Sequence, residues 1–130
     1  MNSSAPAQPS QIHNRAVVWI DHLAAKIFSM GITGVTASVV HAHLASSHLH
    51  HKANSIGSGH VQEDPAFLPQ VAEALESCNE LLILGPGLEK MALLHYLQAV
   101  RPGMALRLEA SGHPSDAEII AVGRKHFRLD

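Results

Sequence analysis

The stretch that decides the fold is Leu81-Leu82-Ile83-Leu84-Gly85-Pro86-Gly87, an apolar run that ends in a glycine turn. Four consecutive large apolar residues are typical of a strand in the middle of a parallel sheet, where both faces are covered. The segment from about 88 to 100 has helical periodicity, and Met91, Leu94 and Leu97 are expected to face the core. A strand followed by a crossover helix indicates an α/β domain.

Three strands are predicted before this stretch. Residues Ala16 to Ile20 form a continuous apolar run, and Asp21-His22 leads into a second strand from Ala25 to Met30. The segment from Val35 to His43 is alternating and rich in β-branched residues, as expected of a third strand. Because the links between these strands are short, we expect an antiparallel meander.

A helix is predicted to begin at Asp64-Pro65, which offers an N-cap acceptor and a proline at the first helical position. It is expected to extend over the amphipathic segment from Phe67 to Cys78. Its apolar stripe at helical spacing consists of Leu68, Val71, Ala72 and Leu75.

The end of the chain is predicted to add a strand from Met104 to Glu109 and a helix that ends near Phe127. Ser115 and Glu118 form a capping box for this helix. The predicted order is therefore β-β-β-α-β-α-β-α. It corresponds to a single α/β domain with a mixed sheet and a ribonuclease-H-like topology, in which the meander is followed by parallel strands.

Composition limits the possible classes of protein. The chain has 130 residues, 46% of them hydrophobic, with a formal charge of −2 and one cysteine. This length suits one domain, and the charge argues against strong general binding of nucleic acid. Residues 1–14 are expected to be a disordered tail, with the folded domain at 15–130. No apolar run reaches the roughly 18 residues of a membrane span, and no secretory signal is apparent, so a cytoplasmic location is expected.

A histidine-rich loop is predicted between the third strand and the first helix, at residues 44–63. In an extended strand, His41 and His43 would share a face at about 7 Å, close enough for both imidazoles to bind one metal ion. Loop histidines such as His48 and His60 would supply further ligands, for zinc or another transition metal. Solvated histidines without a specific role, or histidines that contact anions or RNA once protonated, are the alternatives.

A possible anion site lies at the turn that follows the central apolar strand. Gly85 and Gly87 would allow a phosphate to approach the backbone at a helix N-terminus, and Lys90 would add positive charge. His113 also follows a strand and could join the same crevice, because carboxyl ends of parallel strands line the ligand sites of open α/β sheets. A tight turn required by the fold is the alternative explanation.

These elements carry a resemblance to a known family. The order of elements resembles the middle domain of the archaeal and eukaryotic peptide release factors and of Pelota, and most closely a group of small bacterial translational machinery proteins. The resemblance covers roughly residues 16 to 127. The segments that carry it are Val18-Trp19-Ile20-Asp21-His22, His50-His51-Lys52, Gly59-His60, Phe67 with Val71 to Leu75, Leu82 to Gly87 with Lys90, and His113-Pro114-Ser115-Asp116.

The resemblance implies a role beside the ribosome or a translation factor. Release factors carry Gly-Gly-Gln in the long loop, whereas this chain has Gly57-Ser58-Gly59-His60 at the corresponding place. We therefore expect a non-catalytic binding protein in which His50, His51, Lys52, Gly59 and His60 make contacts from the loop. A metal-dependent hydrolase that uses the cluster from His41 to His60 is one alternative. A self-associating structural protein, in which an exposed strand edge forms a homodimer, is another.

Overall fold

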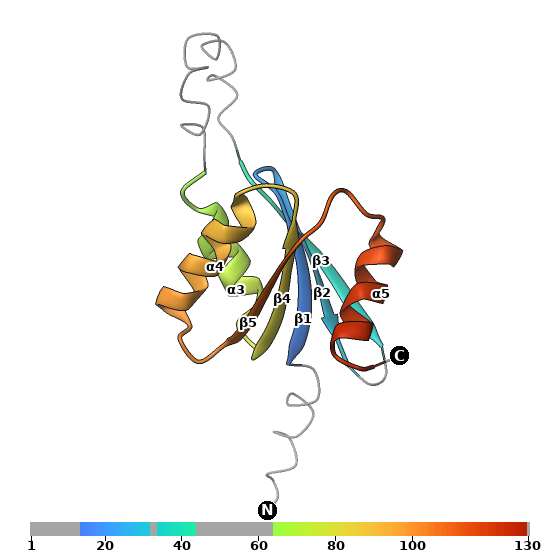
Figure 1. Cartoon of the computed structure of the whole chain (residues 1–130). Helices are drawn as coiled ribbons and strands as arrows, with labels where there is room; N and C mark the ends of the chain where they lie inside the picture. Colours follow the sequence, from blue (N-terminus) through green and yellow to red (C-terminus); the bar gives the residue numbers. More distant parts are fainter. Residues whose placement is uncertain (1–13, 32–33, 44–63, 130) are drawn as a thin grey trace, which may run out of the picture.

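The computed structural model describes residues 14–31, 34–43 and 64–129 (Figure 1). The strands and helices follow the predicted order, and their bounds are β1 (Arg15–Ile20), β2 (Ala24–Met30), β3 (Val35–His41), α3 (Phe67–Ala74), β4 (Glu80–Gly85), α4 (Glu89–Val100), β5 (Ala105–Ala110) and α5 (Asp116–His126). The predicted α/β class is confirmed.

The five strands form one mixed sheet in the order β3-β2-β1-β4-β5. β1 pairs antiparallel with β2, and β2 pairs antiparallel with β3. β4 is parallel to both β1 and β5. The two strands with continuous apolar sequences, β1 and β4, therefore occupy inner positions, where side chains are covered on both faces.

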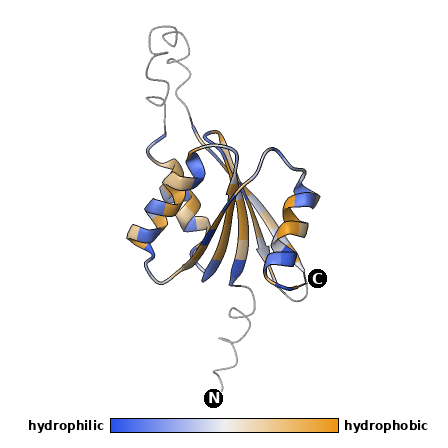
Figure 2. Ribbon diagram, in the orientation of Figure 1, coloured by the Kyte–Doolittle hydropathy of each residue, from blue (hydrophilic) through white to orange (hydrophobic). Residues whose placement is uncertain are grey.

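Helices cover the sheet on both faces, with α3 and α4 on one side and α5 on the other (Figure 1). Side chains that alternate along β1 consequently enter two different cores. Ala16, Val18 and Ile20 belong to the core beneath α3 and α4. Val17 and Trp19 belong to the core beneath α5. Figure 2 shows the hydrophobic residues concentrated on the strands between these helical layers.

Gly123 allows α5 to pack closely on the sheet. A Cβ atom at this position would lie 2.6 Å from Met30 Cε and 2.9 Å from Val17 Cγ1. Both distances are shorter than a normal contact, so glycine permits an approach of helix and sheet that a larger residue would oppose.

The predicted bounds of α3 and β3 are corrected by the structure. α3 begins at Phe67, after a turn at residues 65–66 in which Asp64 Oδ1 accepts from Ala66 N. It ends at Ala74 and does not extend to Cys78. β3 ends at His41 and does not extend to His43.

The buried face of α4 differs from the predicted one. In α4 the buried residues are Leu93 and Leu97, whereas Met91 and Leu94 are only partly covered.

Asn14 was predicted to belong to the disordered tail. Its carbonyl accepts hydrogen bonds from Asn79 N at 2.7 Å and Glu80 N at 3.1 Å. Asn14 is therefore part of the folded domain, hydrogen-bonded to the start of β4.

Candidate functional site

The carboxyl ends of β1, β4 and β5 lie at one edge of the sheet, which we call the carboxyl edge. The three strands are parallel, so Ile20, Gly85 and Ala110 end on the same side. The segment that links β5 to α5 begins at this edge. In open α/β sheets this is where ligands usually bind.

Trp19 and Lys26 are direct cross-strand neighbours at this edge, and their side chains share the face covered by α5. The Trp19 indole is only 5% exposed. Its Nε1–H donates a hydrogen bond to the Gly112 carbonyl at 2.8 Å, which ties β1 to the segment after β5. The Lys26 ammonium lies 5.9 Å from the centroid of the indole, within the range of a cation–π contact.

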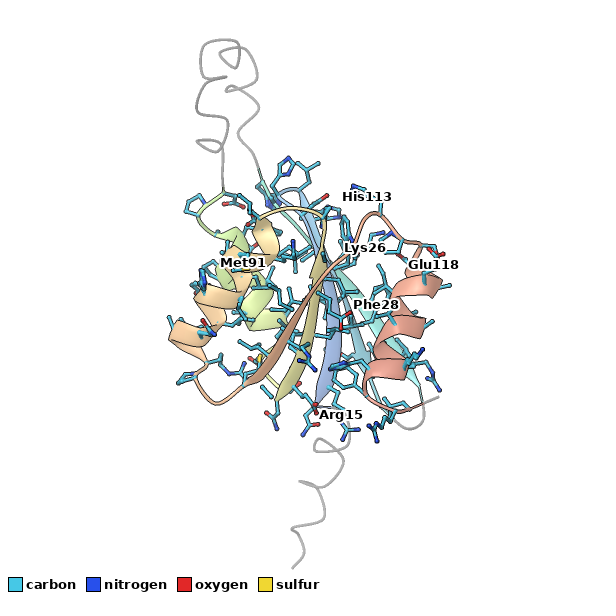
Figure 3. The ribbon with its side chains drawn as sticks, in the orientation of Figure 1. Arg15, Lys26, Phe28, Met91, His113 and Glu118 are labelled. Carbon is cyan, nitrogen blue, oxygen red and sulfur yellow. The ribbon has the colours of Figure 1, made fainter. Side chains whose placement is uncertain are left out.

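His113 and Asp116 complete this arrangement from the other side. The His113 ring packs on Trp19 with centroids 5.2 Å apart and an interplanar angle of 54°. Asp116, in the first turn of α5, accepts from Lys26 Nζ at 3.0 Å. We call Trp19, Lys26, His113 and Asp116 the Trp19 cluster; Figure 3 shows Lys26 and His113 near each other beside the start of α5. The ion pair is largely solvated, so it contributes little to stability.

A hollow of about 400 Å³ lies beside the cluster, between the end of β5 and α5. Leu84, Ile119 and Val122 give it an apolar lining, and Glu109 and His113 supply the ionisable groups. Its size is at the lower end of the range for small-ligand sites. The arrangement can hold an apolar or planar group and donate or accept hydrogen bonds at its rim.

The turn after β4 has a steric explanation at Gly85. A Cβ atom there would overlap the backbone carbonyl oxygen of Ile20. The Gly85 carbonyl accepts from Ser111 N at 3.0 Å. Gly87, by contrast, has open space where a Cβ would be.

Lys90 does not point freely toward a ligand at this turn, since its ammonium donates to the Gly87 carbonyl at 2.6 Å. His113 lines the hollow beside α5, and Gly85, Gly87 and Lys90 are not among the residues lining that hollow. An anion site formed by Gly85, Gly87 and Lys90 remains a prediction.

The predicted metal ligands are only partly within the described residues. His41 ends β3, and the N–H of His43 donates to Asp64 Oδ2 at 2.9 Å. Both histidines are exposed, and His43 lies beyond the strand that was expected to align it with His41. In residues 14–31, 34–43 and 64–129, no group of three His, Cys, Asp or Glu side chains is placed to hold a metal ion.

The remaining predicted residues of the histidine-rich loop lie outside the described part of the chain. They are His48, His50, His51, Lys52, Gly59 and His60. Asp64 joins the two ends that flank residues 44–63, because its Oδ2 accepts from His43 N. Its Oδ1 accepts from Ala66 N at 2.9 Å. These backbone hydrogen bonds, first from His43 and then from Ala66, lower the pKa of Asp64.

Cys78 is buried, and its thiol donates to the Glu80 carbonyl at 3.2 Å. Burial raises the pKa of this thiol to about 11. A thiol with so little thiolate at neutral pH is a poor nucleophile and a poor metal ligand. Cys78 is instead one of the residues of the core beneath α3 and α4.

Sequence reasoning missed Lys26 as a site residue and used Trp19 only as a mark of resemblance. The sequence feature that could have indicated Lys26 is Asp21, a turn-forming residue directly after the first apolar run. Asp21 N donates to the Ala24 carbonyl, and the Asp21 carboxylate accepts from Leu23 N and Ala24 N. A turn closed between Asp21 and Ala24 sets Trp19 opposite Lys26.

Comparison with known proteins adds a likeness of fold. No protein-family model matches this sequence, and no curated protein sequence is significantly similar to it. Among solved structures, Pelota from Archaeoglobus fulgidus superposes with a TM-score of 0.62 at 16% identity, over 97% of this chain and 35% of that protein. Pelota from Thermoplasma acidophilum gives 0.59 at 19% identity, over 94% and 35%.

Dom34 from S. cerevisiae, described as a translation termination-like factor, gives a TM-score of 0.54 at 9% identity, over 92% of this chain and 35% of Dom34. This chain thus spans about a third of the length of the proteins it resembles. At such identities the likeness shows the fold alone: an α/β domain of the type found in Pelota proteins and Dom34. The fold expected from the release-factor and Pelota resemblance is thereby confirmed.

Proposed function

We propose that this chain is a non-catalytic binding protein of the translation apparatus, with the ribosome or a translation factor as its partner. The observation that carries the proposal is the likeness of fold over nearly the whole chain to Pelota proteins and to Dom34, a translation termination-like factor. The same role would place the protein in the cytoplasm. None of the helices in the described residues is long and apolar enough to cross a bilayer.

The proposed contact surface is the carboxyl edge. Two large apolar side chains are exposed near it: Leu23, in the β1–β2 turn, is 50% exposed, and Leu88, just before α4, is 83% exposed. His41 and His43 lie where β3 reaches the same edge, because Ala42 N donates to the Leu23 carbonyl. Exposed apolar residues mixed with ionisable groups are typical of a protein-binding surface.

His43 and Asp64, which flank residues 44–63 in the sequence, lie at this edge and are joined by the hydrogen bond from His43 N to the Asp64 carboxylate. In the proposal, His50, His51, Lys52, Gly59 and His60 contribute contacts from this segment. Hydrolysis of peptidyl-tRNA is not part of the proposed function, because the segment contains Gly57-Ser58-Gly59-His60 and no Gly-Gly-Gln.

Co-sedimentation of the full chain with purified ribosomes tests this proposal. We expect the wild-type protein to pellet with ribosomes, and a variant with residues 48–60 replaced by a Gly-Ser linker of equal length to remain in the supernatant. The double variant Leu23→Ser/Leu88→Ser should also lose binding. Wild-type protein that never pellets with ribosomes or their subunits would overturn the proposal.

Val100→Ser is a matched control, since Val100 is 47% exposed at the far end of α4, away from the carboxyl edge. It should pellet as the wild type does. If it lost binding to the same extent as the Leu23→Ser/Leu88→Ser variant, the contact surface would not be the carboxyl edge.

A metal site at His41, His43, His48 and His60 is the basis of the hydrolase alternative. Elemental analysis of untagged protein tests it directly: one equivalent of zinc or a similar ion, lost in His41→Ala/His43→Ala, would favour the metal-dependent hydrolase. Protein without stoichiometric metal would remove that alternative.

A further inference from the structure

The free edge of β5 has an outward-facing set of backbone groups. Among the described residues, β5 is the last strand of the sheet and pairs with β4 on one side only. Ala105 N donates to Asn79 O at 2.8 Å, and Ser111 N donates to Gly85 O at 3.0 Å. Because backbone groups of a strand alternate in direction, those of Arg107 and Glu109 also face β4. The N–H and C=O groups of the other residues, Leu106, Leu108 and Ala110, face away from the sheet.

The side chains of β5 separate by face. Arg107 and Glu109 are in register with Leu82 and Leu84 and therefore lie on the α5 side, where both are exposed. In the described part of the chain, neither takes part in either of the two ion pairs, Arg15–Glu80 and Lys26–Asp116. On the opposite face, Leu106 and Leu108 pack partly against the core beneath α3 and α4.

These two facts make the edge complementary to itself. We propose that β5 pairs antiparallel with β5 of a second copy of this chain, around a two-fold axis at Leu108, to join two sheets into one. In this register Leu108 is opposite Leu108, and Leu106 is opposite Ala110. Both are hydrogen-bonded pairs, as their outward backbone groups require. Arg107 of each copy is then opposite Glu109 of the other.

Charge selects this register over its neighbours. A two-fold centred on Arg107 would place the two arginines opposite each other, and one centred on Glu109 would oppose the two glutamates. Like charges directly opposite are destabilising, whereas opposite charges at closely spaced pairs are favourable. Only the axis at Leu108 gives two Arg–Glu pairs, and a two-fold interface closes as a dimer.

The other free edge, β3, lacks this complementarity. Its sequence, Val-Thr-Ala-Ser-Val-Val-His from Val35 to His41, contains no acidic or basic residue besides the terminal histidine. Val39 is 50% exposed on β3 and offers a matched control position at the opposite edge of the sheet. The β5 pairing is independent of the translation-related function, which uses the carboxyl edge.

Sedimentation velocity and light scattering over about 1 µM to 1 mM test the pairing, since a six-residue edge gives a small interface and modest affinity. The wild type should shift from 13.9 kDa to twice that mass as concentration rises. Arg107→Glu and Glu109→Arg each create two like-charge pairs. Each should therefore weaken association roughly ten- to hundredfold.

Mixing gives the decisive result. An equimolar mixture of Arg107→Glu and Glu109→Arg restores two opposite-charge pairs across the interface, so a heterodimer should form where each variant alone is monomeric. The double variant Arg107→Glu/Glu109→Arg should again form a homodimer, and Val39→Lys should dimerise as the wild type does. Recovery on mixing also shows that both variants are folded.

Three outcomes would overturn the inference. One is a wild type that remains monomeric at about 1 mM, where even a weak specific pairing would be visible. Another is single charge reversals that dimerise as well as the wild type. The third is a dimer abolished by Val39→Lys but unaffected by the β5 variants, which would assign self-association to β3.

Discussion

The rings of Trp19 and His113 pack against each other. The Trp19 indole N–H also donates to the carbonyl of Gly112, which is 93 positions further along the chain and precedes His113. The two contacts hold the segment after β5 against β1. They also position the start of α5, since Asp116 binds Lys26, the cross-strand neighbour of Trp19. The Trp19 cluster therefore joins the antiparallel strands β1 and β2 to the start of the last helix.

Replacement of His113 by alanine should weaken the contact between β1 and the segment that precedes α5. An aromatic pair is worth about 0.5–1.5 kcal/mol, and the exposure of His113 places the expected loss near the lower end. Trp19 is the only tryptophan in the chain, so its fluorescence reports the change without interference. We expect a red-shifted emission and a small loss of stability in urea, with His113→Phe as the control that retains a ring. An unchanged emission spectrum in His113→Ala would contradict the contact.

Gly85 and Gly87 should respond oppositely to the same substitution. Gly85→Ala places a methyl group against the Ile20 carbonyl oxygen, a backbone atom of a central strand that cannot move cheaply. We expect a loss of about 2–3 kcal/mol in the free energy of unfolding. Gly87→Ala has open space for the methyl group and should change stability by less than about 0.5 kcal/mol. Urea denaturation of both variants provides the comparison, and equal effects would contradict the steric account of Gly85.

Arg101 should contribute more than its charge. Its Nη1 donates to the Leu75 carbonyl at 3.1 Å and its Nη2 to the Cys78 carbonyl at 2.7 Å, which joins the end of α4 to the turn after α3. Arg101→Ala leaves both carbonyls without this donor, and we expect a loss of about 1–3 kcal/mol. Arg101→Lys should be intermediate, because an ammonium cannot reproduce the planar fork of the guanidinium. A lysine variant as stable as the wild type would show that two-point binding is unimportant.

Cys78 should react slowly in the native protein. With its pKa raised to about 11 by burial, the fraction of thiolate at pH 8 is very small. Iodoacetamide labelling followed by mass spectrometry should show slow modification of the folded chain and rapid modification in urea. Rapid labelling of the folded chain would contradict the buried position of the thiol.

The same shift predicts a loss of stability in alkali. The thiol pKa is about 11 when folded and near its ordinary value of 9.0 when unfolded, so the folded state retains its proton over a range in which the unfolded state releases it. This contribution is fully present below about pH 9 and decreases as pH rises toward 11, by roughly 2 kcal/mol. Urea titrations at pH 8 to 11 should show a steeper decline for the wild type than for Cys78→Ala. Parallel curves would contradict the prediction.

Local patterns of sequence determined the elements of this protein. The apolar run from Leu81 to Leu84, the alternation in β5 and the capping box of Ser115 and Glu118 each occupy a few neighbouring residues. The capping box is present, with Glu118 N donating to Ser115 Oγ at 3.1 Å and Ser115 N donating to Glu118 Oε1 at 2.8 Å. Such interactions depend on hydrogen bonds and periodicity within one or two turns, so the sequence alone was sufficient to predict them.

Only the tertiary structure decided which distant side chains meet. One carboxylate oxygen of Asp64 accepts from Ala66 N, a local contact of the kind the sequence predicted, but the other accepts from the N–H of His43, 21 residues earlier. Leu93 rather than Met91 enters the core, because the packing of α4 on the sheet selects the buried stripe. The Trp19 cluster likewise depends on β1 lying between β2 and β4. Contacts of this kind are set by strand order and helix packing, which no short stretch of sequence contains.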